Sequence, residues 1–279
     1  MKTEDYLSQQ FLASHPGDGA LLLQHFSIEE LRGFFLEIKP SIASIVLEYM
    51  PPMMASEIII GLDLECAGSI LEKLSIPVAA GLFRRISTKH RISLLGVLPK
   101  KISFKIQAVL HYPSGTAGAL MDPNVFAVPS HFNIREARFQ MKRFSQDLLS
   151  YLYIVDSTQK LLGVMSIREL MVARPRDRVS SVMNFPVSTI SGHASEGAIL
   201  NHPGWRTFHK IPVTEKGGLL VGIIRYKTLR KLEGIYIGPP LEKTALEFTF
   251  RLGEVYWVGI AAMIQSLNGA MRRTGKSKN

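Results

Sequence analysis

One spacing dominates the first 110 residues of the chain: an apolar residue returns every twelve positions. Seven such residues mark the boundaries of successive units: Ile38, Met50, Leu62, Leu74, Ile86, Leu98 and Leu110. Counted from Phe26, the ninth residue of every unit is also apolar: Phe34, Val46, Ile58, Ile70, Leu82, Leu94 and Ile106. A period kept over this many units indicates a repeat architecture, in which each unit is too short to bury its apolar face alone.

Each unit has the pattern of a short amphipathic helix, because its apolar residues lie three and four positions apart. Prolines stand near unit starts, where helices tolerate them: Pro40, Pro51, Pro52, Pro77 and Pro99. The sixth residue of four units is an alanine, which allows helices to approach closely: Ala43, Ala55, Ala67 and Ala79. The sequence therefore predicts, over residues 1–112, about seven to nine short helices stacked in a right-handed superhelix. Such a domain is either a docking surface or only a packed helical domain.

Charge is divided unevenly along this predicted domain. Residues 1–72 carry 11 acidic residues against 3 Lys and Arg, whereas residues 73–120 carry 8 Lys and Arg and no acid. An acidic end and a basic end permit self-association of opposite ends, or docking of the acidic half onto the basic region that follows. The net charge of +10 is compatible with nucleic acid, but the cations are scattered rather than gathered with aromatic side chains. Nucleic acid is therefore not the expected partner.

A second, longer repeat occupies residues 121–236. An apolar run, a polar turn and another apolar run at residues 151–170 are echoed at residues 209–229. Each set predicts a β-hairpin that leads into a helix. Upstream of the hairpins, the sequence predicts short strands at residues 126–129 and 186–190 and helices at residues 134–144 and 196–200. The two copies, about 121–178 and 179–236, thus share the order β-α-β-β-α.

The junction between the two repeats is punctuated by Pro and Gly, as at a domain boundary. From His111 to Pro123 it reads His-Tyr-Pro-Ser-Gly-Thr-Ala-Gly-Ala-Leu-Met-Asp-Pro. This string resembles the intracellular part of MgtE-type magnesium transporters, where it joins a helical MgtE N domain to a pair of CBS motifs. The resemblance implies a multi-domain α and α+β fold, with a CBS pair over residues 113–236. It also implies a non-catalytic regulatory role and a homodimer formed through the CBS pair.

The resemblance further implies an adenine nucleotide (ATP, ADP or AMP) as ligand. In that family a Ser/Thr-x-x-Asp turn holds phosphate and ribose at a helix N-terminus, which favours anions. The residues at matching positions are Ser166 and Glu169 in the first copy and Arg225 and Thr228 in the second, and Ile211 and Pro212 are further candidate ligand-binding residues. Ser166-x-x-Glu169 is also an ordinary capping box, and Arg225 can meet a phosphate directly. The sequence is therefore compatible with a nucleotide site and also with a structural CBS pair that binds no ligand.

Magnesium sensing is also implied, through carboxylates shared by the N domain, the CBS pair and a connecting helix. Mg²⁺ takes oxygen ligands, and the later helices of the family's N domain are rich in Asp. Here residues 86–92 read Ile-Ser-Thr-Lys-His-Arg-Ile instead, and cations repel the ion. The remaining metal candidates are Glu57, Asp63 and Glu65, on helical faces of a kind that is usually just solvated.

The sequence also lacks the features expected of catalytic sites, histidine-based metal sites, disulfides, secretory signals and membrane spans. The eight histidines show no metal-type spacing with carboxylates or cysteine, and no catalytic set is recognisable, so we expect no enzyme. The single cysteine, Cys66, excludes an internal disulfide and falls on an apolar repeat position. The N-terminus lacks the features of a secretory signal, and no apolar stretch reaches the roughly 20 residues that span a bilayer.

The last residues, 237–279, predict an amphipathic helix followed by a disordered basic tail. Glu247, Arg251 and Glu254 form one polar stripe, and aromatic and aliphatic residues cover the rest of the predicted helix. It would pair with its symmetry mate, lie on a membrane, or dock on a membrane protein or another protein. We therefore predict a cytoplasmic regulatory module, free or against the inner face of the membrane, that responds to an adenine nucleotide or divalent cation and signals to a partner. The alternative is a constitutive protein-interaction scaffold with no ligand.

Overall fold

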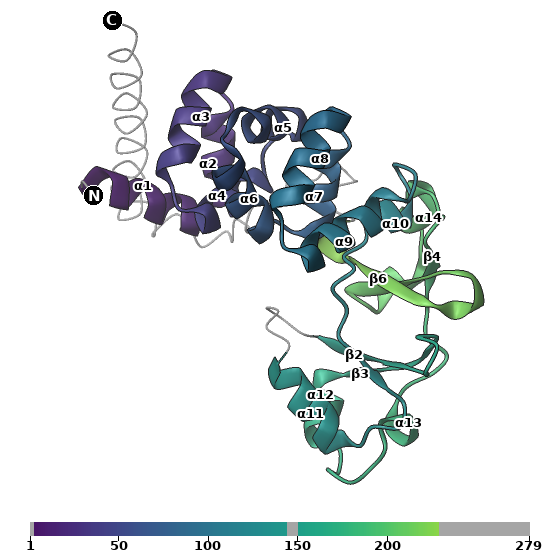
Figure 1. The fold of residues 1–279 in the computed structure, drawn as a ribbon. Helices are drawn as coiled ribbons and strands as arrows, with labels where there is room; N and C mark the ends of the chain where they lie inside the picture. The colour runs from purple at the N-terminus through teal and green to yellow at the C-terminus, as the bar shows by residue number, and fades with distance from the viewer. Residues whose placement is uncertain (1–2, 144–149, 229–279) are drawn as a thin grey trace, which may run out of the picture. The chain divides into compact units, whose positions relative to one another are not determined.

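The computed structural model describes residues 3–143 and 150–228 (Figure 1). These residues fall into two compact units, 3–110 and 111–228. The first unit is helical, and the second contains two small mixed sheets. The helix predicted within residues 237–279 lies outside the described residues.

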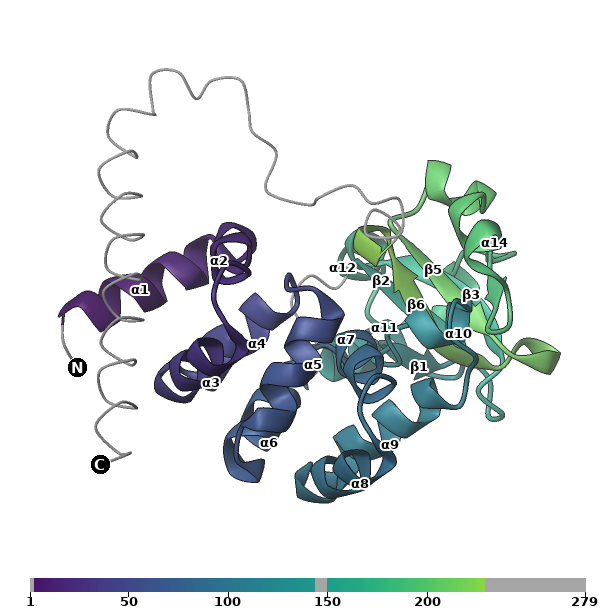
Figure 2. The same cartoon turned by 90° about the horizontal axis from the view of Figure 1, so that it is seen from above.

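The described part of the first unit consists of nine helices connected by short turns (Figure 2). They are α1 Thr3–Ser14, α2 Pro16–Leu23, α3 Ile28–Glu37, α4 Pro40–Leu47, α5 Pro52–Gly61, α6 Leu64–Lys73, α7 Ile76–Phe83, α8 Thr88–Val97 and α9 Lys100–Leu110. Seven of them follow the twelve-residue period, which confirms the predicted helical repeat. Each of α3 to α7 packs against the helix two positions further along the chain, and so buries a face that a free helix would expose.

Two kinds of residue start these helices. Helices α4, α5 and α7 carry a proline in their first turn, at Pro40, Pro52 and Pro77. Side chains cap other helices, because an oxygen atom of Ser27, Asp63 or Ser87 accepts a backbone N–H of α3, α6 or α8. Most repeat units thus contain a local signal that sets where the helix begins.

The alanines at the sixth place of four units belong to the helical core. Their side chains are fully buried. All seven apolar residues at the ninth place are also fully or almost fully buried. At the tenth place the pattern weakens toward the end of the repeat, where Leu95 is half-buried and Gln107 is exposed. The alanines are therefore core residues, and the close approach of helices at these positions stays a prediction.

The second unit contains two copies of one motif, as the second repeat predicts. Each copy has a three-stranded sheet in which the first strand runs parallel to the second and the second antiparallel to the third. The first copy comprises β1 Ala127–Pro129, α11 Ile134–Arg143, β2 Tyr151–Val155, β3 Leu161–Ser166 and α12 Ile167–Val172. The second comprises β4 Ile190–Ser191, α14 Glu196–Leu200, β5 Lys210–Thr214 and β6 Leu220–Arg225, with a helical segment beginning at Tyr226. The short helices α10 Ala117–Leu120 and α13 Val179–Val182 precede the copies.

The first strand of the second copy is shorter and later than predicted. The sequence predicts a strand at residues 186–190, but β4 covers only Ile190 and Ser191, which pair with Val213 and Thr214. Continuing this register backward would bring Thr189 opposite Pro212, which has no N–H to donate. The carbonyl oxygen of Thr189 lies 3.1 Å from Nε2 of His202 instead. The strand prediction is thus wrong in its extent.

The two copies exchange the segments that precede them. The residue before the first copy, Asp122, forms two backbone hydrogen bonds with Ile223 of β6, at 2.8 and 2.9 Å. Asn184, before the second copy, forms the same pair of bonds with Val164 of β3, at 2.8 and 3.0 Å. A glycine on each third strand makes room for the incoming methionine, because a Cβ at Gly163 or Gly222 would lie within 2.6 Å of the sulfur of Met183 or Met121. Each sheet is therefore completed by the other copy's leading segment.

Helices α11 and α12 pack together over the first sheet. The core between them and the sheet includes Ile134, Leu152, Ile154, Met165 and Leu170, all fully buried. The guanidinium of Arg138, on α11, donates to the backbone oxygens of Leu170, Met171 and Ala173 at 2.7–3.0 Å. Arg138 thereby satisfies carbonyl groups at the end of α12.

Candidate functional site

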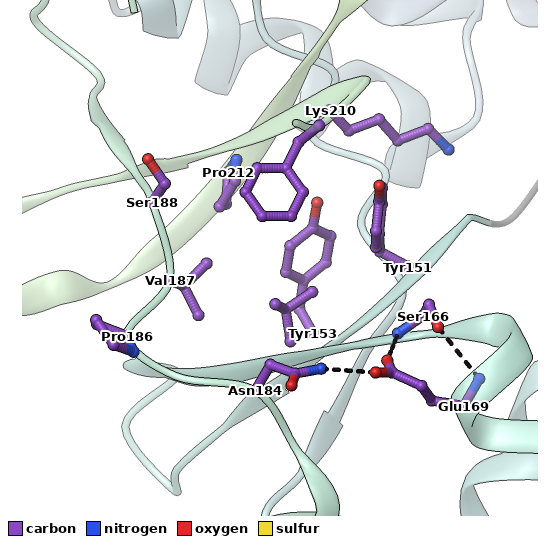
Figure 3. Close-up of a pocket in the computed structure, with 12 residues that line it drawn as sticks. Tyr151, Tyr153, Ser166, Glu169, Asn184, Pro186, Val187, Ser188, Lys210 and Pro212 are labelled. Atoms are coloured by element: carbon purple, nitrogen blue, oxygen red, sulfur yellow. Dashed lines mark hydrogen bonds between the residues drawn. The ribbon is translucent and has the colours of Figure 1, made fainter. Parts of the chain in front are cut away.

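A pocket of about 380 Å³ lies in the second unit and is lined by residues from both copies of the motif (Figure 3). Its residues come from β2, β3, α12, β5 and the segments that precede β4 and β5. They are Tyr151, Tyr153, Val164, Ser166, Glu169, Asn184, Pro186, Val187, Ser188, Phe208, Lys210 and Pro212. This volume lies within the range of pockets that bind small molecules.

Aromatic and aliphatic side chains form much of the pocket wall. The rings of Tyr151 and Phe208 meet edge to face, with centroids 6.1 Å apart. Burial, and to a smaller extent the neighbouring Tyr151, raises the pKa of the Tyr153 hydroxyl well above its usual value. That hydroxyl is therefore neutral at physiological pH. The wall offers flat, uncharged surfaces suited to a planar ring.

A capping box forms the polar part of the pocket. The backbone N–H of Ser166 donates to Oε2 of Glu169 at 2.7 Å, and the N–H of Glu169 donates to Oγ of Ser166 at 3.1 Å. The side-chain amide of Asn184 donates to Oε1 of Glu169 at 3.0 Å, as the dashed lines of Figure 3 show. The bond from Ser166, followed by that from Asn184, lowers the pKa of Glu169. The pocket thus presents an ionised carboxylate in a fixed orientation, beside the hydroxyl of Ser166.

Lys210 supplies positive charge to the same pocket. Its backbone on β5 lies directly opposite Arg225 on β6. Burial lowers the pKa of Lys210, and Arg225 lowers it further, whereas Asp122 acts in the opposite direction. The pocket therefore combines apolar walls, a hydrogen-bond acceptor and a cation.

The residues that the sequence singles out fall in different places. Ser166, Glu169 and Pro212 line the pocket. Ile211 is buried, because it alternates with Lys210 and Pro212 and so faces the other side of β5. Arg225 and Thr228 are not among the lining residues. Arg225 forms an ion pair with Asp122, and Thr228 is half-buried in the segment that begins at Tyr226.

Several lining residues escaped the sequence analysis, notably Tyr151, Asn184 and Lys210. They are far apart in the sequence and meet only because each copy receives the other copy's leading segment. One signal was readable: Lys210 and Pro212 alternate with the apolar Ile211 and Val213, which indicates that they face away from the core.

The three metal candidates do not form a site by themselves. Glu57, Asp63 and Glu65 are all exposed, and Oδ1 of Asp63 accepts the N–H of Cys66 at 2.8 Å as the cap of α6. Within residues 3–143 and 150–228, no group of three or more His, Cys, Asp and Glu residues is placed to hold a metal ion. Over the same residues, no helix has the length and apolar character needed to span a bilayer.

Comparisons with known proteins agree with this architecture. Residues 14–115 match the MgtE intracellular N domain, and residues 117–176 match the CBS domain. The magnesium transporter MgtE of Thermus thermophilus is 29% identical over 164 residues, which are 58% of this chain and 35% of that protein. The chain therefore spans about a third of the length of this curated relative.

Two solved structures are similar to this chain over most of its length. One is the cytosolic domain of the Mg²⁺ channel MgtE in complex with ATP, with a TM-score of 0.58 and 25% identity over 77% of this chain and 93% of that one. The other is the soluble part of a magnesium transporter, with a TM-score of 0.59 and 19% identity over 84% of this chain and 98% of that one. The chain thus carries an MgtE intracellular N domain followed by a CBS pair, and it is homologous to the cytosolic part of MgtE magnesium transporters.

Proposed function

We propose that this chain is a non-catalytic regulatory module whose CBS pair binds an adenine nucleotide and passes the binding event to a partner. The observation that carries the proposal is the pocket that both copies line, because it joins apolar walls to Ser166 and the ionised Glu169. The solved MgtE cytosolic domain that contains ATP supports the same class of ligand.

The chemistry of the pocket fits the parts of a nucleotide. Phe208 and Pro212 provide surfaces on which an adenine ring would stack. The carboxylate of Glu169 would accept hydrogen bonds from ribose hydroxyls, and the hydroxyl of Ser166 would donate to a phosphate oxygen. Because both copies line the pocket, a bound nucleotide would hold them together and restrain their relative movement.

A response to divalent cations remains a separate prediction. The exposed Glu57, Asp63 and Glu65 would need ligands from another molecule or from residues outside the described parts of the chain. The competing function is a constitutive scaffold, for which exposed apolar residues of the helical unit, such as Ile92 and Phe104, would supply contacts.

We also propose that the CBS pair mediates homodimerisation through the outer face of α11 and α12. Phe139, Met171 and Val172 are all more than half exposed there, on two helices that pack against each other. An isologous interface would cover these apolar side chains with the same surface of a second copy.

Thermal unfolding of the whole chain, with and without ATP, ADP, AMP or Mg²⁺, tests the regulatory proposal. A ligand that binds only the folded state at a hundred times its Kd stabilises it by about 2.7 kcal/mol, a shift of several degrees. We expect this shift with an adenine nucleotide and its loss in Ser166→Ala. If no nucleotide or Mg²⁺ shifts the wild-type midpoint, the regulatory proposal fails and the scaffold remains.

Ser195→Ala is the matched control for that experiment. Oγ of Ser195 caps α14 by accepting the N–H of Ala198, and Ser195 does not line the pocket. Both serine variants therefore lose an N-cap, at a cost of about 1 kcal/mol. Only Ser166→Ala should also lose the nucleotide-dependent shift. If both variants lose the nucleotide-dependent shift equally, the loss reflects weakened folding rather than a changed binding site.

A further inference from the structure

The pocket has an uncharged side and a charged side. In Figure 3, Pro186 and Val187 lie on one side of the pocket, while Ser166, Glu169 and the ammonium of Lys210 lie toward the other. Glu169 and Lys210 are the charged residues among those that line the pocket within the described residues. Glu169 already accepts hydrogen bonds from Ser166 and Asn184. A nucleotide with its ring against the uncharged side would therefore direct its phosphates toward Lys210.

The surroundings of Lys210 favour an anion beside it. Lys210 and Arg225 are direct neighbours across β5 and β6, so two cations share one patch of sheet. The carboxylate of Asp122 is engaged by Arg225. The pKa of Lys210 is lowered, first by burial and then by Arg225, which means that its positive charge is disfavoured where it lies. A phosphate placed near the ammonium would offset that cost.

We propose that Lys210 makes this pocket selective for the phosphate chain of the nucleotide, so that ATP and ADP bind more tightly than AMP. The proposal rests on the proposed function and adds to it the residue that discriminates among nucleotides. The physical reason is that each further phosphate brings negative charge toward a cation that is partly withdrawn from water, where electrostatic attraction is stronger than in bulk solvent.

Titration calorimetry with ATP, ADP and AMP on the full chain, in buffer without divalent cations, tests the proposal. Wild type is expected to bind ATP about tenfold more tightly than AMP, which is the size of one charge-assisted hydrogen bond. Lys210→Met keeps the aliphatic stem and removes the charge, and it should weaken ATP binding about tenfold and AMP binding less than twofold. Lys210→Arg should keep the preference for ATP. Raising the salt concentration should weaken ATP binding more than AMP binding.

Lys160→Met is the matched control, because Lys160 is exposed on the β2–β3 turn and does not line the pocket. It should leave all three affinities unchanged. If wild type binds AMP as tightly as ATP, or if Lys210→Met weakens both equally, the inference about Lys210 is overturned while the nucleotide site stands. If wild type binds none of the nucleotides, the proposed function fails and the inference fails with it.

Discussion

At the scale of single residues, one ion pair distinguishes the two copies of the motif. Arg225 of the second copy stands where the first copy has Ser166, and it binds Asp122, as Glu169 binds Asn184 in the first copy. Arg225 lies at the end of β6, and Glu169 lies in α12, the helix after β3. Each contact therefore joins one copy to the leading segment of the other. The side chains of Asp122 and Arg225 are only 10% and 25% exposed. Removal of one partner therefore leaves a partly buried charge without its counterion.

A double-mutant cycle measures this ion pair. Asp122→Asn alone and Arg225→Met alone should each lower the free energy of unfolding by about 2 kcal/mol. The double variant should lose less than the sum of the two, because no unpaired charge remains. Urea unfolding, monitored by tryptophan fluorescence, gives the change in the free energy of unfolding for each of the three variants. Strictly additive losses would show that the two side chains do not stabilise the fold through each other.

Sequence reasoning reached some residues of the pocket and missed others for a physical reason. Ser166 and Glu169 were found because a capping box has a fixed local spacing. Asn184 was missed because its contact with Glu169 depends on the exchange of segments, which no local pattern encodes. Arg225 was predicted to meet a ligand, whereas its partner in the structure is Asp122, 103 residues away in the sequence.

At the scale of elements, the twelve-residue period places small residues in the helical core. Ala67 on α6 is fully buried, whereas Glu72 on the same helix is exposed. Ala67→Leu should lower the free energy of unfolding by about 2 kcal/mol, because the added atoms have no space between helices. Glu72→Leu should change it by less than about 0.5 kcal/mol. Chemical denaturation measures both, and an equal effect would contradict the assignment of Ala67 to a helix contact.

Most elements were predictable because their signals are local. The repeat predicts helix ends, and Ile38, Leu62, Leu74 and Leu98 each follow directly after a helix. The first strand of the second copy was misplaced because its extent depends on a proline in a strand more than twenty residues later. The extent of a strand depends on its pairing partner, which is distant in the sequence. The local sequence of one strand therefore gives little information about where its pairing begins or ends.

At the scale of the whole molecule, the proposed dimer interface on the outer face of α11 and α12 makes a prediction about the state of association. Phe139→Asp would place a charge in the proposed dimer interface, so this variant should sediment as a monomer at concentrations where wild type is a dimer. Phe104→Asp is the control, because Phe104 is 74% exposed on α9, in the helical unit. Sedimentation velocity distinguishes the species. A wild-type monomer, or a Phe139→Asp variant that remains dimeric, would contradict the proposed interface.

The exchange of segments between the two copies also bears on the order in which the chain folds during synthesis. In the helical unit, side-chain to backbone contacts between helices span about 25 residues, such as Arg32 to Glu57 and Arg84 to Val109. Such local contacts form quickly and can be made while the chain is still leaving the ribosome. Asp122 must wait for Ile223 and Arg225, so its contacts form only after the second copy has been translated, whereas the first sheet needs only the segment up to Asn184. The contacts of Asp122 with the second copy are therefore expected to be among the last of this region to form.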